Sequence, residues 1–208
     1  MQEKRSTLAR LSVKQMVPTG VIHGRFQVLH NDHLKYLMAG KSRCHHLVVG
    51  ITNPDPRLTK EEDCDPHRSI PFANPLTYFE RHTLVRAVLE EAGLSHNDFS
   101  VVPFPINFPE LYAYYVPLQA TFFVTVYDDW GRKKLERFRS LGLKTEILWE
   151  RPLTQKGLSA SDIRLRMARG EDWKHLVPPS TQRLMTLGDI PNRLRRWYEI
   201  EHGKPAHG

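Results

Sequence analysis

Hydrophobic and polar positions follow two different patterns along residues 20–150. Short apolar runs rich in β-branched residues, bounded by turn residues, are typical of buried strands. Between them lie segments with apolar residues at helical spacing, such as Leu34, Leu37 and Met38. The predicted strands cover 20–24, 46–52, 100–105, 121–127 and 144–149, and the predicted helices cover the segment around Leu34, 74–92 and 130–141.

Strands and helices therefore alternate, and the first strand, helix and strand fit within about 35 residues, the length of a βαβ unit. Alternation of this kind predicts an α/β fold with a doubly wound parallel sheet. Within the predicted helix 74–92, Thr77 is a candidate N-cap with Glu80 three residues later, and Gly93 ends the helix.

The pattern changes after residue 150, where 159–168, 180–187 and 191–201 predict helices without a strand among them. We therefore expect three regions: an N-terminal extension over 1–19, a nucleotide-binding α/β core over 20–150, and a helical C-terminal part over 151–208 that packs on the sheet. Residues 53–73 hold four prolines and show no period. They predict a long loop at a strand end, which is either a lid or substrate loop or a partly disordered segment.

The composition narrows the class of protein. The net charge is +7 and the pI about 9.5, which suits anionic partners. No run of 18 apolar residues predicts a transmembrane helix, and residues 1–19 lack the apolar segment of a secretory signal, so we expect a cytoplasmic protein without membrane contact. The basic residues lack interleaved aromatic residues on a strand, which argues against nucleic acid as a partner. The basic run 132–134 is interpreted as a solvated helix face.

The two cysteines, Cys44 and Cys64, are expected to be free thiols. A zinc site that also uses His45, His46 and His67 is a weaker hypothesis, because the spacing matches no compact zinc signature.

Candidate chemistry begins where the first strand runs into the segment GRFQVLHNDH, residues 24–33. This segment matches neither the GxGxxG pattern nor the Walker pattern. His30 and His33 lie at the start of a helix after a strand, where free N–H groups and the helix dipole attract anions. Their imidazoles could donate to phosphate oxygens, and Gly24 would allow close approach of the backbone. The competing interpretation is that the two histidines only cap the helix.

A second polar cluster, LSASDIRLR, covers residues 158–166. Ser159 or Ser161 can cap the predicted helix, with Asp162 in its first turn. Arg164 lies one turn further on, where its guanidinium could clamp a phosphate held by the helix N-terminus.

Four motifs in this order carry a resemblance: GRFQxxHxxH from residue 24, NPLTYFER at 74–81, PFPINFPELYAYYVP at 103–117 and SASDIR at 159–164. They resemble the nucleotidylyltransferases of the HxGH type, and among these the archaeal-type nicotinamide-nucleotide adenylyltransferases. The resemblance implies a Rossmann-like sheet with a helical C-terminal part. It also implies transfer of AMP from ATP to nicotinamide or nicotinate mononucleotide with release of pyrophosphate, and a Mg²⁺ ion that bridges the phosphates.

The resemblance further implies roles for individual residues, with no protein residue as a metal ligand. Asn107 and Tyr112 match the substrate loop, where Tyr112 replaces a tryptophan expected to stack on the nicotinamide. The implied catalytic residues are His30, His33 and Arg164, and the implied nucleotide-binding residues are Gly24, Arg25, Phe26, Ser159, Ser161 and Arg164.

Three departures from the family pattern keep alternatives open, and one of them is the unexpected length of residues 53–73, which could remodel the acceptor pocket. Asp32 replaces the glycine between the histidines, and its charge should weaken phosphate binding unless it points away or meets the metal. Asp128, Asp129 and Trp130 replace a Gly-Asn turn near the base, so the choice between ATP and CTP stays open. The alternatives are a nucleotidyltransferase with another acceptor or base, such as a cytidylyltransferase, or a catalytically weakened nucleotide sensor. Small-molecule nucleotides are the expected partners in each case, and a homo-oligomer is neither required nor excluded.

Overall fold

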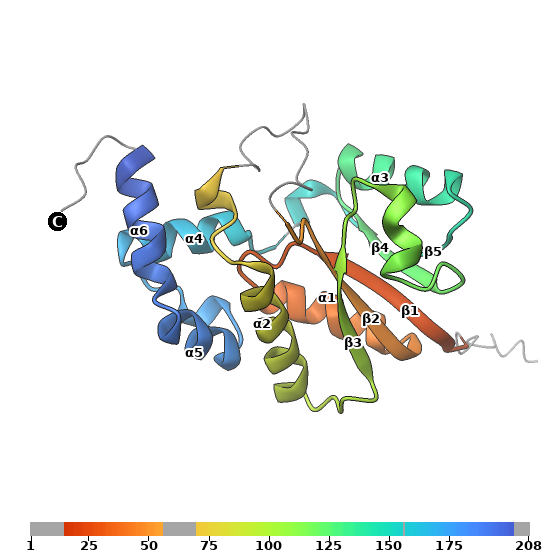
Figure 1. The fold of residues 1–208 in the computed structure, drawn as a ribbon. Coiled ribbons are helices and arrows are strands. Elements are labelled where there is room, and N and C mark those ends of the chain that lie inside the picture. Colours follow the sequence, from red (N-terminus) through yellow and green to blue (C-terminus); the bar gives the residue numbers. More distant parts are fainter. Residues whose placement is uncertain (1–14, 56–69, 156, 202–208) are drawn as a thin grey trace, which may run out of the picture.

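The computed structural model describes residues 15–55, 70–155 and 157–201 of the 208-residue chain (Figure 1). Five strands alternate with helices up to residue 150, and three helices follow. The strands are β1 (Val17–Gly24), β2 (Cys44–Thr52), β3 (Phe99–Phe104), β4 (Thr121–Val126) and β5 (Lys144–Glu150). The α-helices are α1 (Asn31–Lys41), α2 (Tyr78–Glu91), α3 (Asp129–Ser140), α4 (Ala160–Arg169), α5 (Pro179–Leu187) and α6 (Ile190–Glu201).

The strands form one parallel sheet in the order β3-β2-β1-β4-β5. This is the predicted doubly wound, Rossmann-like fold. The chain reverses its winding direction between β1 and β4, which creates a topological switch point. Among the described residues, β1 pairs with β4 only at Gly20–Thr121 and Val21–Phe122. The two strands therefore separate toward their carboxyl ends, where open α/β sheets bind ligands.

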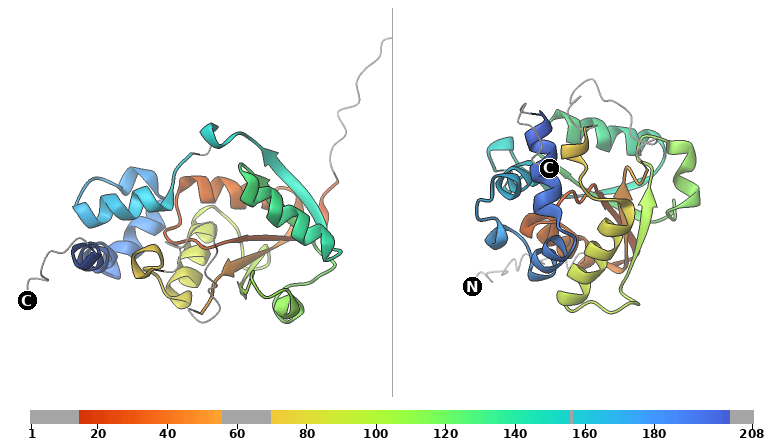
Figure 2. Two further views of the ribbon diagram at one scale, coloured as in Figure 1. Left: turned by 90° about the horizontal axis from the view of Figure 1, so that it is seen from above. Right: turned by 60° about the vertical axis from the view of Figure 1, so that its left-hand side comes forward.

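The two faces of the sheet carry separate hydrophobic clusters, because successive side chains of a strand point to opposite sides. Ile22 and Val49 face the cluster that includes residues of α1, α2, α4, α5 and α6. Val21 and Val48 face the other cluster, which includes residues of α3 and of the 3₁₀ helix η4 (Pro109–Tyr114). Helices thus cover both faces (Figure 2).

The C-terminal helices share their core with the sheet. Ile163 and Met167 of α4 belong to the same cluster of buried residues as Ile22. Arg193 of α6 also donates to both carboxylate oxygens of Glu80 in α2, at 2.8 and 3.0 Å. Figure 1 shows α4, α5 and α6 grouped on the side of the sheet where α2 lies. The C-terminal helices are therefore part of the same hydrophobic core as the sheet.

Most element boundaries agree with the sequence predictions to within a few residues. The predicted capping box is confirmed: Thr77 accepts from the Glu80 N–H, and Glu80 accepts from the Thr77 N–H. Helix α2 begins at Tyr78 rather than at residue 74, because Pro75 disfavours helical backbone at Asn74. Strand β1 begins at Val17, before the expected end of the N-terminal extension.

Some expectations concern residues outside the described ranges: most of the extension 1–19, the central part of the loop 53–73, and Cys64 and His67 of the zinc hypothesis. Cys44 is buried, and its thiol lies 3.4 Å from the Gly40 carbonyl oxygen. Within the described ranges, no three His, Cys, Asp or Glu side chains are grouped as metal ligands. No helix in these ranges is both long and apolar enough to cross a bilayer.

Candidate active site

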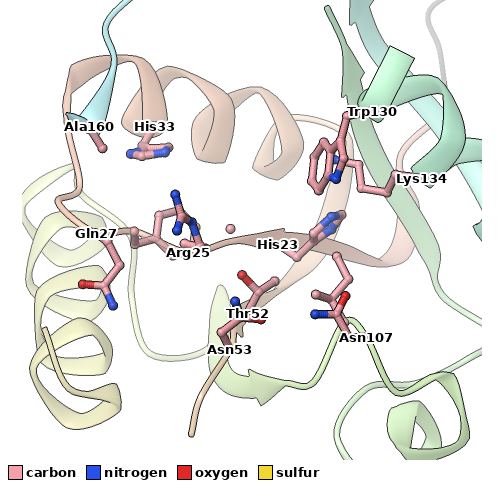
Figure 3. Close-up of a pocket in the computed structure, with 13 residues that line it drawn as sticks. His23, Arg25, Gln27, His33, Thr52, Asn53, Asn107, Trp130, Lys134 and Ala160 are labelled. Atoms are coloured by element: carbon pink, nitrogen blue, oxygen red, sulfur yellow. The ribbon is translucent and has the colours of Figure 1, made fainter. Parts of the chain in front are cut away.

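Two adjoining cavities open at the carboxyl ends of β1 and β4. The smaller cavity has a volume of about 240 Å³ and extends toward the ends of β2 and β3. The larger cavity, of about 570 Å³, extends toward β5 and α4. Both are lined by His23, Arg25, His33, Trp130 and Lys134, so the two spaces form one continuous site. Figure 3 shows the side chains that line the smaller cavity.

The larger cavity is surrounded by the N-termini of three helices. Its lining includes His30 at the start of α1, Asp128 at the start of α3 and Ser159 at the start of α4. Each N-terminus presents backbone N–H groups and the positive end of a helix dipole. Three such ends directed at one space favour a ligand with several negative charges.

His30 and His33 cap α1 reciprocally. The backbone N–H of each approaches the Nδ1 atom of the other at 3.4 Å, and their rings stack with centroids 3.7 Å apart. Burial lowers the pKa of His30 to about 4, although Asp32 opposes this shift. Burial, helped by the charges of His30 and Arg25, also lowers the pKa of His33 well below its usual range. Both rings are therefore neutral near pH 7, and each carries one N–H donor. A hydrogen bond to the Val28 backbone opposes the pKa shift of His33, so an incoming oxygen would compete with Val28 for the donor of that ring.

The predicted serine cap of α4 is present, because the Ser159 hydroxyl accepts from the Ser161 N–H at 3.1 Å. Both serines line the larger cavity. Arg164 is 3% exposed and lines neither cavity. Its guanidinium donates to the Gln27 carbonyl and, at 2.9 Å, to the Ser161 hydroxyl. Arg164 thereby joins the loop after β1 to the first turn of α4.

Asp32, which replaces the expected glycine, is directed at the segment before α4. Its carboxylate accepts from the Leu158 N–H at 2.7 Å and pairs with Lys35 at 2.8 Å. Burial alone would raise the pKa of Asp32, but the hydrogen bonds from Lys35 and Leu158 outweigh it and lower the pKa. Gly157 leaves the space for this contact, since a Cβ atom there would lie 2.1 Å from the carboxylate. The Asp32 carboxylate thus holds the backbone of the segment that precedes α4.

The turn after β1 brings the backbone and Arg25 into both cavities. Gly24 has a second local role, because a Cβ atom there would lie 2.8 Å from the Phe26 ring. Phe26 is fully buried, has a φ of 53° and lines the smaller cavity. The structure therefore brings Gly24, Arg25 and Phe26 together with His33, as the motif predicts for residues of one site.

The substrate loop is only partly at the cavity surface. Asn107 lines the smaller cavity, whereas Tyr112 does not. Tyr112 is 2% exposed, packs on Phe104 with ring centroids 4.6 Å apart, and donates to the Ile106 carbonyl at 2.5 Å. Tyr112 therefore supports the segment that carries Asn107, and its ring lies in the hydrophobic core.

Buried Arg81 organises the strand ends and was not anticipated from the sequence. It is 2% exposed and donates to the carbonyl oxygens of Arg25, Thr52 and Asn53 at 3.1, 2.7 and 2.8 Å. Burial and the nearby charge of Arg25 lower its pKa to about 10, so it stays charged at neutral pH. Its place at the end of the motif NPLTYFER was a signal that the residue matters, but it did not indicate these distant partners.

The lining also contains His23 and Lys134, which were not expected as site residues, and Trp130, which was expected only as part of a turn near the base. Lys134 belongs to the basic run interpreted as a solvated helix face, and this interpretation is wrong for Lys134. Its ammonium lies 4.6 Å from the centre of the Trp130 ring, and both side chains face the cavities (Figure 3). The available signal was their place in the first two turns of the helix after a predicted strand.

Aromatic side chains line the larger cavity on the β5 side. The Trp149 indole N–H donates to the Tyr127 hydroxyl at 2.5 Å, and Tyr36 packs edge-on against Trp149 with ring centroids 6.1 Å apart. All three residues line the cavity. Aromatic surfaces beside an anion site can accommodate the base and the phosphates of one nucleotide.

A Rossmann-like sheet with buried basic groups and three helix N-termini at its switch point is typical of proteins that bind phosphorylated ligands. Comparison with known proteins makes the class specific. No protein-family model matches the chain. However, the chain is 52% identical over 185 residues to a phosphonoformate cytidylyltransferase from Streptomyces viridochromogenes, with 89% of this chain and 100% of that protein covered.

The chain is also 33% identical over 167 residues to a nicotinamide-nucleotide adenylyltransferase from Thermococcus kodakarensis, covering 79% of this chain and 80% of that protein. It therefore belongs to the nucleotidyltransferases of the HxGH type. The structure resembles a bifunctional NMN adenylyltransferase/ADP ribose pyrophosphatase from Francisella tularensis, with a TM-score of 0.63 and 14% identity. That match covers 90% of this chain but only 56% of the bifunctional protein, and it shows the fold alone.

Proposed function

We propose that the protein transfers CMP from CTP to a small acceptor that carries a phosphonate and a carboxylate, such as phosphonoformate, with release of pyrophosphate. The observation that carries this proposal is the 52% identity to a phosphonoformate cytidylyltransferase over that protein's whole length. This relationship supports one of the alternatives left open by the sequence, a cytidylyltransferase, better than adenylyl transfer to a pyridine mononucleotide.

The smaller cavity supports a compact anionic acceptor. Among the described residues that line it, Arg25 and Lys134 are cationic and none is an Asp or Glu. Amides of Asn53 and Asn107 complete a polar rim. As the smaller of two connected spaces, with a volume of about 240 Å³, it leaves room for a small acceptor beside a nucleotide in the larger one.

The reaction requires positioning and charge neutralisation rather than a general base. A phosphonate oxygen of the acceptor is already deprotonated at neutral pH, and it attacks the α-phosphorus of CTP. A new phosphorus–oxygen bond forms while the bond between the α-phosphorus and the bridging oxygen breaks, and pyrophosphate leaves with the negative charge. Donors fixed around the triphosphate stabilise the charge that develops in this in-line displacement.

The larger cavity would hold the triphosphate. His30 and His33 would donate from the α1 N-terminus, and Ser159 and Ser161 from the α4 N-terminus. Arg25 lines both cavities and would neutralise charge where donor and acceptor phosphorus groups meet. Arg164, which is buried between Gln27 and Ser161, would position these groups rather than contact the phosphates. The Tyr127–Trp149 pair would flank the cytosine.

A divalent cation, expected to be Mg²⁺, fits this site as a companion of the triphosphate. The two carboxylates that line the larger cavity, Asp32 and Asp128, both accept from backbone N–H groups. Magnesium in nucleotide sites is held largely by phosphate oxygens and water, and needs at most one or two carboxylates. When bound, the ion would neutralise charge on the phosphates. A structurally similar NMN adenylyltransferase/ADP ribose pyrophosphatase from Francisella tularensis has been solved in complex with AMP and a manganese ion.

Adenylyl transfer to nicotinamide mononucleotide is the second candidate, supported by relatives of about one-third identity. Tyr112, which stands where the resemblance implies a ring that stacks on the nicotinamide, is buried against Phe104. Without a movement of that segment, its ring offers no surface to a pyridine in the smaller cavity.

The test is pyrophosphate release in the presence of Mg²⁺, with CTP or ATP crossed against phosphonoformate, nicotinamide mononucleotide and no acceptor. We expect release with CTP plus phosphonoformate and a new phosphorus–oxygen–phosphorus resonance in the ³¹P NMR spectrum of the product. Release only with ATP plus nicotinamide mononucleotide would overturn the proposal in favour of the second candidate. Nucleotide binding without release for any pair would favour a sensor.

A further inference from the structure

His23 is the last residue of β1 before the motif that begins at Gly24. It is 5% exposed, and neither of its ring nitrogens has a hydrogen-bond partner within the described structure. The ring packs against Phe104 and Phe138, with centroids 5.7 and 5.3 Å away. An aliphatic side chain would fill this space without burying two unsatisfied polar atoms, which carry a free-energy cost. The packing of the ring therefore contributes to stability, but its two nitrogen atoms do not.

The unsatisfied ring faces the site. His23 lines both cavities, at the point where β1 and β4 have separated. Figure 3 shows the ring between Arg25 on one side and Trp130 and Lys134 on the other, with Asn107 below it. Both ring nitrogens are buried beneath the cavity surface, so a ligand in the smaller cavity would reach them after a small side-chain movement that leaves the backbone of the fold in place.

The surroundings determine which ligand group suits this position. Lys134 is near enough that its charge adds to burial in holding the pKa of His23 well below its usual range. The ring is therefore neutral in the empty site and offers one N–H donor. With a lysine and an asparagine amide beside it and no acidic residue in the described lining, the best partner is an anionic oxygen.

We propose that His23 is a specificity-determining residue that donates a hydrogen bond to the second acid group of the acceptor, the carboxylate of a phosphonocarboxylate. This inference rests on the proposed function, and it explains how the site would distinguish a phosphonocarboxylate from a phosphonate without a carboxylate. Arg25 and His33 lie toward the opposite end of the smaller cavity from Lys134 (Figure 3). The attacking phosphonate would lie at that end, and the carboxylate at the end formed by His23, Lys134 and Asn107.

The test compares phosphonoformate with methylphosphonate, which lacks the carboxylate, as acceptors with CTP and Mg²⁺. His23→Leu keeps the apolar packing and removes the donor. We expect it to lower kcat/KM for phosphonoformate roughly 10- to 100-fold, chiefly through the acceptor KM. The KM for CTP and kcat/KM for methylphosphonate should change less than about threefold. His23→Asn, which keeps a donor, should restore part of the preference.

His46→Leu is the matched control. His46 lies on the neighbouring strand β2, outside both cavities, and its ring nitrogens contact the Asn97 carbonyl and the Ser100 hydroxyl at 2.9 Å each. Its loss should lower thermal stability and leave acceptor preference unchanged, whereas His23→Leu should unfold at or above the wild-type temperature.

Two kinds of result would overturn the inference. Wild-type protein that uses phosphonoformate, combined with an unchanged acceptor preference in His23→Leu or an equal loss with both acceptors, would exclude the role of His23 and leave the proposed function intact. Wild-type protein that transfers CMP to neither phosphonate would exclude the proposed function and this inference with it.

Discussion

Asp32 illustrates how a single residue acquires a role from a distant segment. It occupies the position between two histidines where a carboxylate would repel a triphosphate. Its oxygens instead accept from Leu158 and Lys35, and Gly157 provides the necessary space. The carboxylate lines the larger cavity, but its oxygens are held by these partners. It fixes the segment that leads to Ser159.

We therefore expect Asp32→Ala to raise the KM for CTP about three- to tenfold, because the approach to the α4 N-terminus loses its anchor. Gly157→Ala should have a similar effect, since its Cβ atom would displace the carboxylate. In the Asp32→Ala background, Gly157→Ala should add little. Steady-state kinetics of the four proteins test this cycle, and fully additive effects would contradict the anchor.

His33 lies closer than Asp32 to the place where the two substrates would meet, because it lines both cavities. His33→Ala should lower kcat at least about tenfold, since the charge that develops on phosphate loses a donor. The measurement is pyrophosphate release at saturating CTP. Circular dichroism would verify the fold, and an unchanged kcat in a folded variant would remove His33 from the catalytic set.

At the scale of elements, the site depends on how strand ends and helix starts are joined. Arg164 joins the loop after β1 to α4, and Asp32 joins α1 to the segment before α4. Arg81 reaches from α2 to the ends of β1 and β2. Each connection uses a buried or half-buried charged group to satisfy backbone atoms that no regular element satisfies.

Arg81→Met should lower the free energy of unfolding by about 3 kcal/mol, because strand-end carbonyls lose their donor inside the protein. Urea denaturation measures this change. Arg86→Met on the same helix is the control, since Arg86 contacts the exposed side chains of Glu90 and His96 in the described structure, and its loss should cost less than about 0.5 kcal/mol. Equal stability of both variants would contradict the structural role of Arg81.

At the scale of the whole molecule, three buried or half-buried histidines lie close together at the switch point of the sheet. The pKa values of His23, His30 and His33 are all lowered, chiefly by burial. These rings resist protonation in the folded protein and accept protons freely in the unfolded chain. Their effect on folding therefore depends on pH in a direction that the pKa shifts determine.

The unfolded chain binds more protons than the folded protein below about pH 6.5, so stability should fall as the pH falls toward 4. For His30, whose pKa is lowered to about 4, the loss should be about 2 kcal/mol between pH 7 and pH 5. Urea denaturation at pH 7 and pH 5 measures this change. In His30→Asn, the free energy of unfolding should fall by about 2 kcal/mol less between the two pH values than it does in the wild type. An identical pH dependence in wild type and variant would contradict the burial of a neutral His30.

The sequence determined the features that depend on neighbours along the chain. Hydrophobic period and turn residues predict the order of strands and helices, and Thr77 and Glu80 predict their capping box, because these interactions span a few residues. The HxxH and SASDIR segments indicate phosphate chemistry for the same reason, since a helix start and its capping side chains are local.

Only the tertiary structure decided what depends on contacts between distant segments. Asp32 meets Leu158 across 126 positions, and Arg164 meets Gln27 across 137. The burial of Tyr112, the unsatisfied ring of His23 and the inward position of Lys134 likewise follow from how the sheet and its helices pack. Such contacts leave no period or spacing in the sequence, because each partner is selected by the three-dimensional arrangement and not by its distance along the chain.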